Sequence, residues 1–331
     1  MNKLNEELKF YADLITKEAL LRIDKIQPPE LRDSCAHLIK GGGKRLRPFV
    51  LINVGEGFGM KIDALIPAAL AVEYIHNFSL IHDDIIDQDE VRRGLKTVHV
   101  LWGTPMAIIA GDMLFAMAFT TLNELKKFDI PSNRIQVANN LLALATQRLA
   151  IGQSYDILFP NEEHVNIDSY LRMIYLKTGA LFESSSEIGA VIAGAKGEKR
   201  IAMRRFGRNI GIAFQIIDDI LGVVGDEKIT GKPVGNDIRE GKKTLPIIYA
   251  LKHGDVKIKE LLRKNLGNKL ITKEDIKEIQ DILLTTGVID HSYKLAKQYG
   301  ENARKNLAVL PNKDQKELLD ELIEFILVRN Y

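Results

Sequence analysis

The sequence predicts an all-α protein. Apolar side chains recur at helical spacing over nearly the whole 331-residue chain, and strand-length stretches that alternate Val, Ile and Thr are scarce. Several of the helical runs are apolar around most of their circumference. A helix without a polar face cannot lie at the surface, so these runs indicate the inner helices of a bundle.

We expect long helices whose ends are set to within about 2–4 residues. The helix at 4–25 is amphipathic with mixed charge. The helices at 64–88 and 198–224, the second and sixth, each end in an aspartate cluster, and the helix at 167–195 contains an interruption at Thr178–Gly179. A polar, glycine- and lysine-rich segment at 225–244 follows the sixth and has the length of a functional loop. The expected ranges are 4–25, 64–88, 104–126, 132–157, 167–195, 198–224, 273–307 and 313–328.

Composition limits the possible functions. No linker or change of composition divides the chain, so we expect one domain over residues 1–331. Basic and acidic residues nearly balance, 46 against 44, which gives no support for a nucleic-acid partner. A single cysteine, Cys35, excludes an internal disulfide and a cysteine-rich metal site and fits a reducing cytoplasm. The N-terminal stretch has neither the apolar core of a signal peptide nor a membrane span, so we expect a cytoplasmic protein.

The stretch "LIHDDIIDQDEVRRG", residues 80–94, places acidic side chains at the end of an apolar helix. Asp83 and Asp87 are four residues apart and therefore share a helix face, with Asp84 beside them. Carboxylates at a helix C-terminus oppose the macrodipole and repel one another, and a bound cation removes both penalties. Mg²⁺ with a diphosphate suits this arrangement. Taken alone, the cluster is also compatible with a solvated helix end.

A second acidic cluster follows another apolar helix in "AFQIIDDILGVVGD". Asp218 and Asp219 again precede a polar, basic loop. Recurrence at the ends of two inner helices favours a function over chance. If the two helices are neighbours in a bundle, their acidic ends face each other across the mouth of a cavity and form a site for several metal ions.

Basic residues form two further clusters. "GGGKRLRP", residues 41–48, is not a P-loop, because no strand precedes it and Arg45 rather than Ser or Thr follows Lys44. Glycines at a helix start, with Lys44 and Arg47 three apart, still suit an anion. A solvated basic helix start is the alternative, and Arg92 and Arg93 are similarly ambiguous alone. His76 lies two turns before Asp83 and is either a satisfied core residue or a ligand.

Together these residues resemble the trans-isoprenyl diphosphate synthases. The resemblance covers nearly the whole chain and consists of five ordered blocks, "GGGKRLRP", "EYIHNFSLIHDDIIDQDEVRRG", "LKTGALF", "FQIIDDILG" and "GKPVGNDIREGKKTLP". It implies the isoprenoid synthase fold, a bundle of long helices around a deep central cavity, usually in a homodimer. It also implies three Mg²⁺ ions between the two aspartate clusters and an allylic diphosphate.

The resemblance assigns a role to each matching residue. It makes Asp83, Asp87 and Asp218 metal ligands, with Asp84 and Asp219 beside them. Arg92 matches the residue that grips the allylic diphosphate. The isopentenyl diphosphate site is matched by Lys44, Arg47, His76 and Arg93, and the positions flanking the allylic substrate by Lys177, Thr178, Gln215, Lys232 and Lys242.

One position departs from the family pattern. The second motif usually ends in aspartate four residues after Asp218, where this chain has Gly222. This puts the strength of the third metal site in doubt, and Asp226 or Asp237 is a possible substitute through water.

Chain length of the product is expected to follow cavity depth. Phe78 lies five residues before Asp83, about 7.5 Å deeper along the helix, and is a candidate for the cavity floor. By resemblance, a bulky Phe78 beside a small Ser79 implies mainly geranylgeranyl diphosphate, as in archaeal-type enzymes. The alternatives are a farnesyl or a bifunctional farnesyl and geranylgeranyl synthase, a terpene cyclase, and a non-catalytic regulatory subunit.

Overall fold

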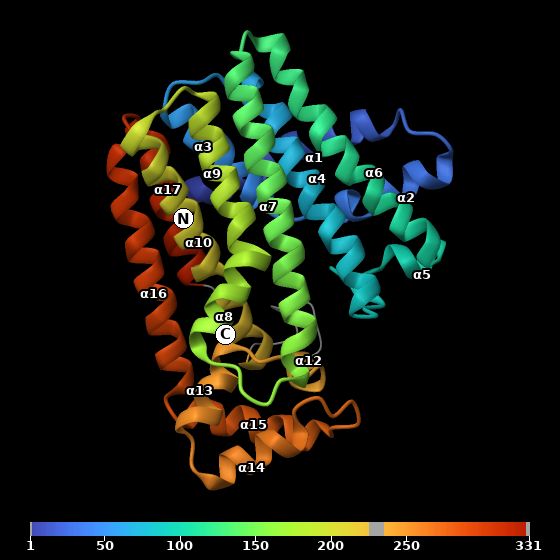
Figure 1. The fold of residues 1–331 in the computed structure, drawn as a ribbon, viewed down its shortest axis with the longest axis vertical. Coiled ribbons are helices and arrows are strands. Elements are labelled where there is room, and N and C mark those ends of the chain that lie inside the picture. The colour runs from blue at the N-terminus through green and yellow to red at the C-terminus, as the bar shows by residue number, and fades with distance from the viewer. Residues whose placement is uncertain (1, 225–234, 329–331) are drawn as a thin grey trace. The chain divides into compact units, whose positions relative to one another are not determined.

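The computed structural model describes residues 2–224 and 235–328, and helices account for most of them (Figure 1). The only strands among the described residues form one short antiparallel pair, β1 (Val91–Arg92) and β2 (Leu95–Lys96), in which Val91 pairs with Lys96. The prediction of an all-α fold is confirmed. The chain divides into two compact units, each assembled from several segments.

The first unit comprises Met1–Thr146, Leu181–Gly207 and Asn306–Leu322. It holds the start of α7 (Ser132–Leu158) and of α10 (Gly197–Val224), most of α9 (Ala180–Ile192), η4 (Leu307–Val309), and most of α17 (Lys313–Leu327). Its complete N-terminal elements are α1 (Asn2–Ile23), α2 (Pro29–Lys40), α3 (Leu46–Gly57), α4 (Ile62–Ile86), α5 (Val98–Trp102), α6 (Thr104–Leu122) and the 3₁₀ turn η1 (Asn123–Phe128).

Helices α4 and α6 form the most extensive contact in the first unit and run side by side in Figure 1. Their close packing follows from small residues on α6, where Ala107, Ala110, Gly111 and Ala118 are all buried. A Cβ atom added at Gly111 would lie 2.2 Å from Nε2 of His82 on α4. The interface therefore leaves no room for a larger side chain at this point of α6.

The second unit comprises Gln147–Ala180, Arg208–Lys305 and Ile323–Tyr331. It contains the C-terminal parts of α7 (Ser132–Leu158) and α10, with short turns at η2 (Phe159–Asn161) and η3 (Tyr175–Gly179). The other helices are α8 (Ile167–Ile174), α12 (Asn236–Arg239), α13 (Leu245–His253), α14 (Val256–Asn265), α15 (Lys273–Thr285) and α16 (Val288–Asn306).

The predicted helix at 167–195 is divided as expected. A π-helical turn, η3, separates α8 from α9 and includes both Thr178 and Gly179. The predicted helix at 273–307 is instead two helices, α15 and α16. They are separated by Thr286 and Gly287, and Gly287 has a φ of +71°, which an α-helix does not tolerate.

Sequence periodicity also failed to locate several helices. Helix α3 is buried over Phe49–Val54, so its apolar run carries no helical period. Helices α2, α13 and α14 are only 12, 9 and 10 residues long. Short segments give too few repeats for a period to be recognised, and their formation depends on tertiary packing.

Two segments have the length and hydropathy of membrane-spanning helices. The buried share of the apolar window is 72% in Ile62–Ile86 and 39% in Thr104–Phe128. The first is accounted for as a core helix. The second leaves an exposed apolar face, which needs a separate explanation.

Candidate functional site

The glycine-rich turn before α3 brings basic side chains to α4 within the first unit. Arg47 Nη1 lies 3.3 Å from Nε2 of His76, and the Arg47 guanidinium stacks 4.5 Å above the ring centre of Phe182. On the hairpin β1–β2, Arg93 donates to the carbonyl oxygens of Leu38 and Gly42. Arg47 and Arg93, two of the predicted cations of the isopentenyl diphosphate site, are therefore held by contacts within the fold, whereas Lys44 is exposed.

The environment of His76 fixes its protonation state. Burial, followed by the positive charge of Arg47 and of three other arginines, lowers the pKa of His76 well below its usual 6.5. The imidazole is neutral at pH 7. Because a guanidinium can only donate, Nε2 accepts from Arg47 and Nδ1 carries the proton. Nδ1–H is thus available as a donor to an anion.

The first aspartate cluster ends α4. Asp83 and Asp87 are both half-buried, and the backbone N–H of Asp87, the C-cap residue, donates to the Asp83 carbonyl at 2.8 Å. Asp84 differs from them because its side chain is almost fully buried, and its Oδ1 accepts from Arg92 Nε at 2.5 Å. Burial raises the pKa of Asp84, and the charge of Arg92 opposes that rise. Asp84 therefore fixes the orientation of Arg92.

Magnesium suits the donors that this cluster offers. Carboxylate oxygens are hard ligands, and Asp84 Oδ2 is buried without a hydrogen bond from the described residues. Among residues 2–224 and 235–328, no three Asp, Glu, His or Cys side chains converge closely enough to hold a metal ion alone. The remaining ligands would have to come from water and diphosphate, which is the usual arrangement for Mg²⁺.

The second aspartate cluster contains two carboxylates with different surroundings. Asp218 is exposed near the end of α10, whereas Asp219 accepts hydrogen bonds on both oxygens. Tyr170 donates its hydroxyl to Oδ2 at 2.6 Å and Gln215 donates its amide to Oδ1 at 2.7 Å. The chain of contacts continues from Gln215 Oε1 to the hydroxyl of Thr178 at 2.6 Å. Burial, then the charge of Asp237, raises the pKa of Asp219 to about 8.

Asp237 occupies the space beside the glycine that departs from the family pattern. A Cβ atom added at Gly222 would lie 2.3 Å from Oδ2 of Asp237. The carboxylate of Asp237 thus lies beside position 222, where the family pattern has an aspartate side chain. This geometry supports Asp237 as its substitute, and Asp226, the other candidate, lies outside the described residues.

The predicted lysines of the second unit are paired with carboxylates. Lys177 Nζ lies 2.6 Å from Asp156 Oδ2, and Lys242 Nζ lies 2.6 Å from Glu240 Oε2. Burial by itself would raise the pKa of Asp156, but the charges of Lys177 and Lys242 bring it below its usual value. Both lysines therefore act on one carboxylate, and Lys232 lies outside the described residues.

Phe78 is held in an aromatic row between α4 and α6. Its ring centre lies 4.9 Å from that of His82 and 5.5 Å from that of Phe115, and Phe115 contacts Phe119 at 5.2 Å. Edge-to-face packing of this kind restricts the ring to one orientation. The side chain is half-buried, so part of its surface is available to line a cavity.

Each unit brings together its own share of the predicted residues. Sequence reasoning missed the residues that hold them in place, namely Tyr170, Asp156, Glu240 and the buried pair of Arg45 and Glu73. A buried acidic residue such as Glu73 in an apolar helix was the one available signal, because burial of a charge requires a partner. The approach of Asp83 and Asp218 to each other stays a prediction.

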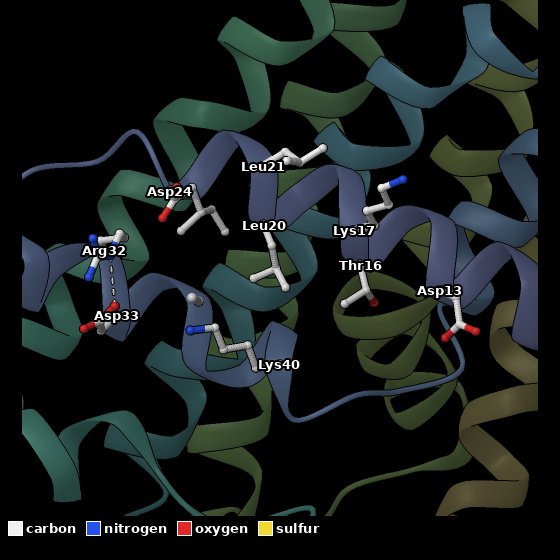
Figure 2. A pocket seen from close by; sticks show the side chains of 11 residues that line it. Asp13, Thr16, Lys17, Leu20, Leu21, Asp24, Arg32, Asp33 and Lys40 are labelled. Carbon is white, nitrogen blue, oxygen red and sulfur yellow. Dashed lines mark hydrogen bonds and ion pairs between the residues drawn. The ribbon is translucent and has the colours of Figure 1, made fainter.

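A separate hollow lies between α1 and α2 in the first unit, and none of the predicted site residues lines it. It has a volume of about 540 Å³, and Figure 2 shows the side chains from both helices around it. Its lining mixes charges of both signs with aliphatic groups. The lining residues are Asp13, Thr16, Lys17, Leu20, Leu21, Ile23, Asp24, Arg32, Asp33, Ala36 and Lys40.

A fold of packed helices that carries these two acidic and two basic clusters defines a protein class. Residues 28–283 match the polyprenyl synthetase family model, and the chain belongs to this family.

Particular relatives agree over nearly the whole length. The chain is 44% identical to a geranylfarnesyl diphosphate synthase of Aeropyrum pernix, over 92% of this chain and 96% of that protein. It is 40% identical to a geranylgeranyl diphosphate synthase of Saccharolobus solfataricus, over 98% and 99% of the two chains. The structure of a geranylgeranyl pyrophosphate synthetase from Pyrococcus horikoshii superposes with a TM-score of 0.91 at 40% identity, covering 99% of each chain.

Proposed function

We propose that this protein is a trans-prenyltransferase. It condenses isopentenyl diphosphate head-to-tail with the allylic diphosphates dimethylallyl, geranyl and farnesyl diphosphate, and it releases mainly geranylgeranyl diphosphate. Family membership and the names of the similar archaeal enzymes support this function. The relatives also include a geranylfarnesyl diphosphate synthase, so the product length has to be measured on this chain.

One observation carries the proposal beyond resemblance. Helix α4 holds His76, which contacts Arg47, and two turns later it holds Asp83 and Asp87. The rise of an α-helix places His76 about 10 Å from Asp83 and about 16 Å from Asp87 along the axis. A cationic pocket and a pair of metal-type carboxylates on one helix suit two different diphosphates. A terpene cyclase has one diphosphate to bind and no use for the first pocket.

Binding comes first in the mechanism. Lys44, Arg47 and Arg93 hold the diphosphate of isopentenyl diphosphate, and His76 donates Nδ1–H to it. Arg92, kept in place by Asp84, grips the allylic diphosphate. Asp83, Asp87 and Asp218 are the residues that would hold Mg²⁺, with Asp84 and Asp219 beside them. Three bound Mg²⁺ ions would supply the charge that makes the allylic diphosphate a leaving group.

Ionisation then breaks the allylic C–O bond, and the electron pair leaves with the diphosphate. Lys177, Lys242 and Lys232 neutralise charge that develops on the leaving group, which lowers the barrier where charge separation is greatest. The π-helical turn at Tyr175–Gly179 frees backbone carbonyls from regular α-helical bonding. The carbonyl of Lys177, the hydroxyl of Thr178 and the amide of Gln215 present negative dipoles to the allylic cation.

Condensation follows from positioning. The double bond of isopentenyl diphosphate attacks the cation and forms the new carbon–carbon bond, and a proton is then lost to the released diphosphate. Holding both reactants in place makes this step effectively unimolecular. Elongation repeats until the chain meets Phe78, which we propose as the floor of the cavity.

We further propose that residues 1–331 act as one catalytic domain in a cytoplasmic homodimer. The exposed apolar face of α5 and α6 supports dimerisation, because a second copy of the same face would cover it. It includes Val100, Leu101, Ile108, Ile109 and Phe115. The charge balance of the chain supports the absence of a nucleic-acid partner.

The decisive experiment incubates the purified protein with Mg²⁺, isopentenyl diphosphate and each allylic primer, and sizes the products by chromatography. A C20 diphosphate is expected as the main product. A C15 product would assign a farnesyl synthase, and a cyclic hydrocarbon would assign a terpene cyclase. Activity that appears only after adding an active synthase would assign a regulatory subunit.

A further inference from the structure

An arginine is buried in the turn that carries the basic residues. Arg45 lies between Lys44 and Arg47, and its side chain and that of Glu73 on α4 are each only 1% exposed. Arg45 Nη1 lies 2.8 Å from Glu73 Oε1. The backbone of Arg45 is left-handed, with φ +47° and ψ +42°, which is unfavourable for a residue other than glycine. Such a conformation persists only where the surroundings enforce it.

The Arg45 guanidinium ties three helices to the start of α3. Nη2 donates to the Ile39 carbonyl at 2.7 Å, in the last turn of α2, where carbonyls lack partners within the helix and a cation is favoured. Nη2 and Nε also lie 3.3 and 3.4 Å from the hydroxyl of Thr16 on α1. With Glu73 on α4, this one side chain contacts α1, α2 and α4.

These contacts determine where Lys44 and Arg47 lie. Lys44 directly precedes Arg45, and Arg47 in the first turn of α3 meets His76, one turn after Glu73 on α4. Glu73 is itself oriented by Asn77, whose amide donates to Oε1 at 2.8 Å. The Arg45–Glu73 and Arg47–His76 contacts, between residues 28 and 29 positions apart in sequence, thus join the same turn to the same face of α4. A shift of Arg45 relative to Glu73 would displace both pocket cations.

A direct role in binding does not fit this geometry. The guanidinium of Arg45 is enclosed, and its charge is compensated by Glu73, so it has no free surface for a phosphate. Glu73 Oε2 is buried and accepts no hydrogen bond from the described residues, so Arg45 is the charge that compensates this carboxylate. Replacing such a pair by apolar groups often preserves stability, so its presence suggests a specific geometry.

We propose that Arg45 and Glu73 are positioning residues for the non-allylic diphosphate pocket, with Thr16 in support. Their buried ion pair holds the left-handed turn so that Lys44 and Arg47 face the pocket shared with His76. This inference rests on the proposed function, because the pocket is the one assigned to isopentenyl diphosphate. Arg92, which we assign to the allylic diphosphate and which lies in the same unit, pairs with Asp84 rather than with Glu73. The allylic side of the reaction is therefore expected to be independent of the pair.

The test compares Arg45→Lys and Glu73→Gln with the wild-type protein. Lysine cannot reach Glu73, Ile39 and Thr16 together, and glutamine keeps the hydrogen bond but removes the charge. We expect KM for isopentenyl diphosphate to rise about tenfold, because displaced cations bind less well, while KM for farnesyl diphosphate stays within about twofold. Calorimetric titration of isopentenyl diphosphate without Mg²⁺ should show the same loss. Arg200→Lys is the control, because it makes the same change in another arginine–glutamate pair of the first unit, Arg200–Glu187.

Thr16→Val keeps the test decisive where a charged variant does not fold, since it removes only a hydroxyl that Arg45 contacts. It should raise the same KM about two- to threefold. Unchanged isopentenyl diphosphate affinity in every folded variant, or an equal rise of both KM values, would overturn the proposal. A wild-type protein that forms no prenyl product and does not bind isopentenyl diphosphate would refute the proposed function instead, so the two failures are distinguishable.

Discussion

His76 lies among four arginines, and their charges determine when its imidazole can take up a proton. Burial and these charges lower the pKa of His76 in the folded protein, whereas the unfolded value is near 6.5. Below pH 6.5 His76 is therefore protonated in the unfolded chain but stays neutral in the folded chain. Stability rises with pH wherever the unfolded state binds more protons, so it must fall as the pH drops through this range.

We predict that the wild-type protein loses stability on acidification by up to about 1.4 kcal/mol per pH unit below 6.5 through His76 alone. His76→Gln lacks this titration and should lose less between pH 7.5 and 5.5. Urea unfolding of both proteins across this range, without diphosphate, measures the difference. If the free energies of unfolding of the two proteins change in parallel with pH, His76 takes up its proton at the same pH in the folded and unfolded states.

Tyr170 is a second residue at this scale, and its hydroxyl holds the side chain of Asp219 in place. Its hydroxyl occupies one oxygen of Asp219, and Gln215 occupies the other. We predict that Tyr170→Phe lowers the free energy of unfolding by about 1–3 kcal/mol, because Asp219 loses a buried hydrogen-bond donor. Asp219, the partner of the Gln215 amide, is then held less firmly, so more allylic diphosphate should be hydrolysed without condensation. Released prenyl alcohol, quantified by chromatography, measures this loss.

Tyr293→Phe is the control, since the hydroxyl of Tyr293 makes no hydrogen bond among the described residues. An equal effect of both variants would remove the role assigned to Tyr170. Asp218 and Asp219 are adjacent in sequence and chemically identical, so a motif cannot separate them. The contacts with Tyr170, 49 residues earlier, and with Gln215 distinguish the enclosed Asp219 from the exposed Asp218.

At the scale of elements, Gly152 lets α7 lie against the π-helical turn. A Cβ atom added there would lie 2.2 Å from the backbone nitrogen of Lys177. Alanine usually stabilises a helix relative to glycine by about 0.5–1 kcal/mol. We predict the opposite sign for Gly152→Ala, a loss of about 1–3 kcal/mol, because α7 must move away from the turn.

Thermal unfolding of Gly152→Ala checks this sign, and KM for the allylic diphosphate should rise as Lys177 moves. Ser154→Ala, an exposed site on the same helix, is the control. A more stable Gly152→Ala protein would mean that α7 and the π-helical turn leave room for a methyl group at this position. The sequence indicated the interruption at Thr178 and Gly179, but a contact made by a glycine without a side chain leaves no pattern to detect.

Phe78 links two elements and is the expected floor of the cavity. Its ring is packed by Phe115 on α6, so truncation opens space that the neighbouring rings do not fill at once. We predict that Phe78→Ala lengthens the products beyond C20, as sized by chromatography. Phe10→Ala, an exposed ring on α1, should leave chain length unchanged. Identical product lengths in wild type and Phe78→Ala would reject the floor assignment.

At the scale of the whole molecule, helical periodicity predicted the long helices but neither the breaks between helices nor the contacts between distant segments. Long helices such as α4, α7 and α10 were predicted within a few residues, because many turns repeat the same period. The break at Gly287 was not predicted, since both flanking segments keep a helical pattern and a single glycine does not reveal its φ. Positioning residues such as Glu73 were missed because ion pairs between distant segments exist only after folding.

The exposed face of α5 and α6 sets the last prediction. Ile108 and Phe115 are seven residues apart and share one side of α6, and Ile109 beside them is 50% exposed. An apolar face of this kind, on a helix long enough to span a membrane, needs either a protein partner or lipid. A second copy of the chain covers it without a membrane and satisfies the symmetry of a closed dimer.

We predict that the wild-type protein sediments as a dimer and that Ile109→Asp sediments as a monomer, because a carboxylate buried in an apolar interface lacks a partner. Phe10→Asp places the same charge on an exposed apolar residue of α1 and should remain dimeric. Sedimentation velocity distinguishes these states, and co-sedimentation with lipid vesicles tests the alternative. A wild-type protein that sediments as a monomer and binds vesicles, with vesicle binding lost in Ile109→Asp, would assign the face to lipid. In that case the substitution abolishes membrane binding while both proteins remain monomeric.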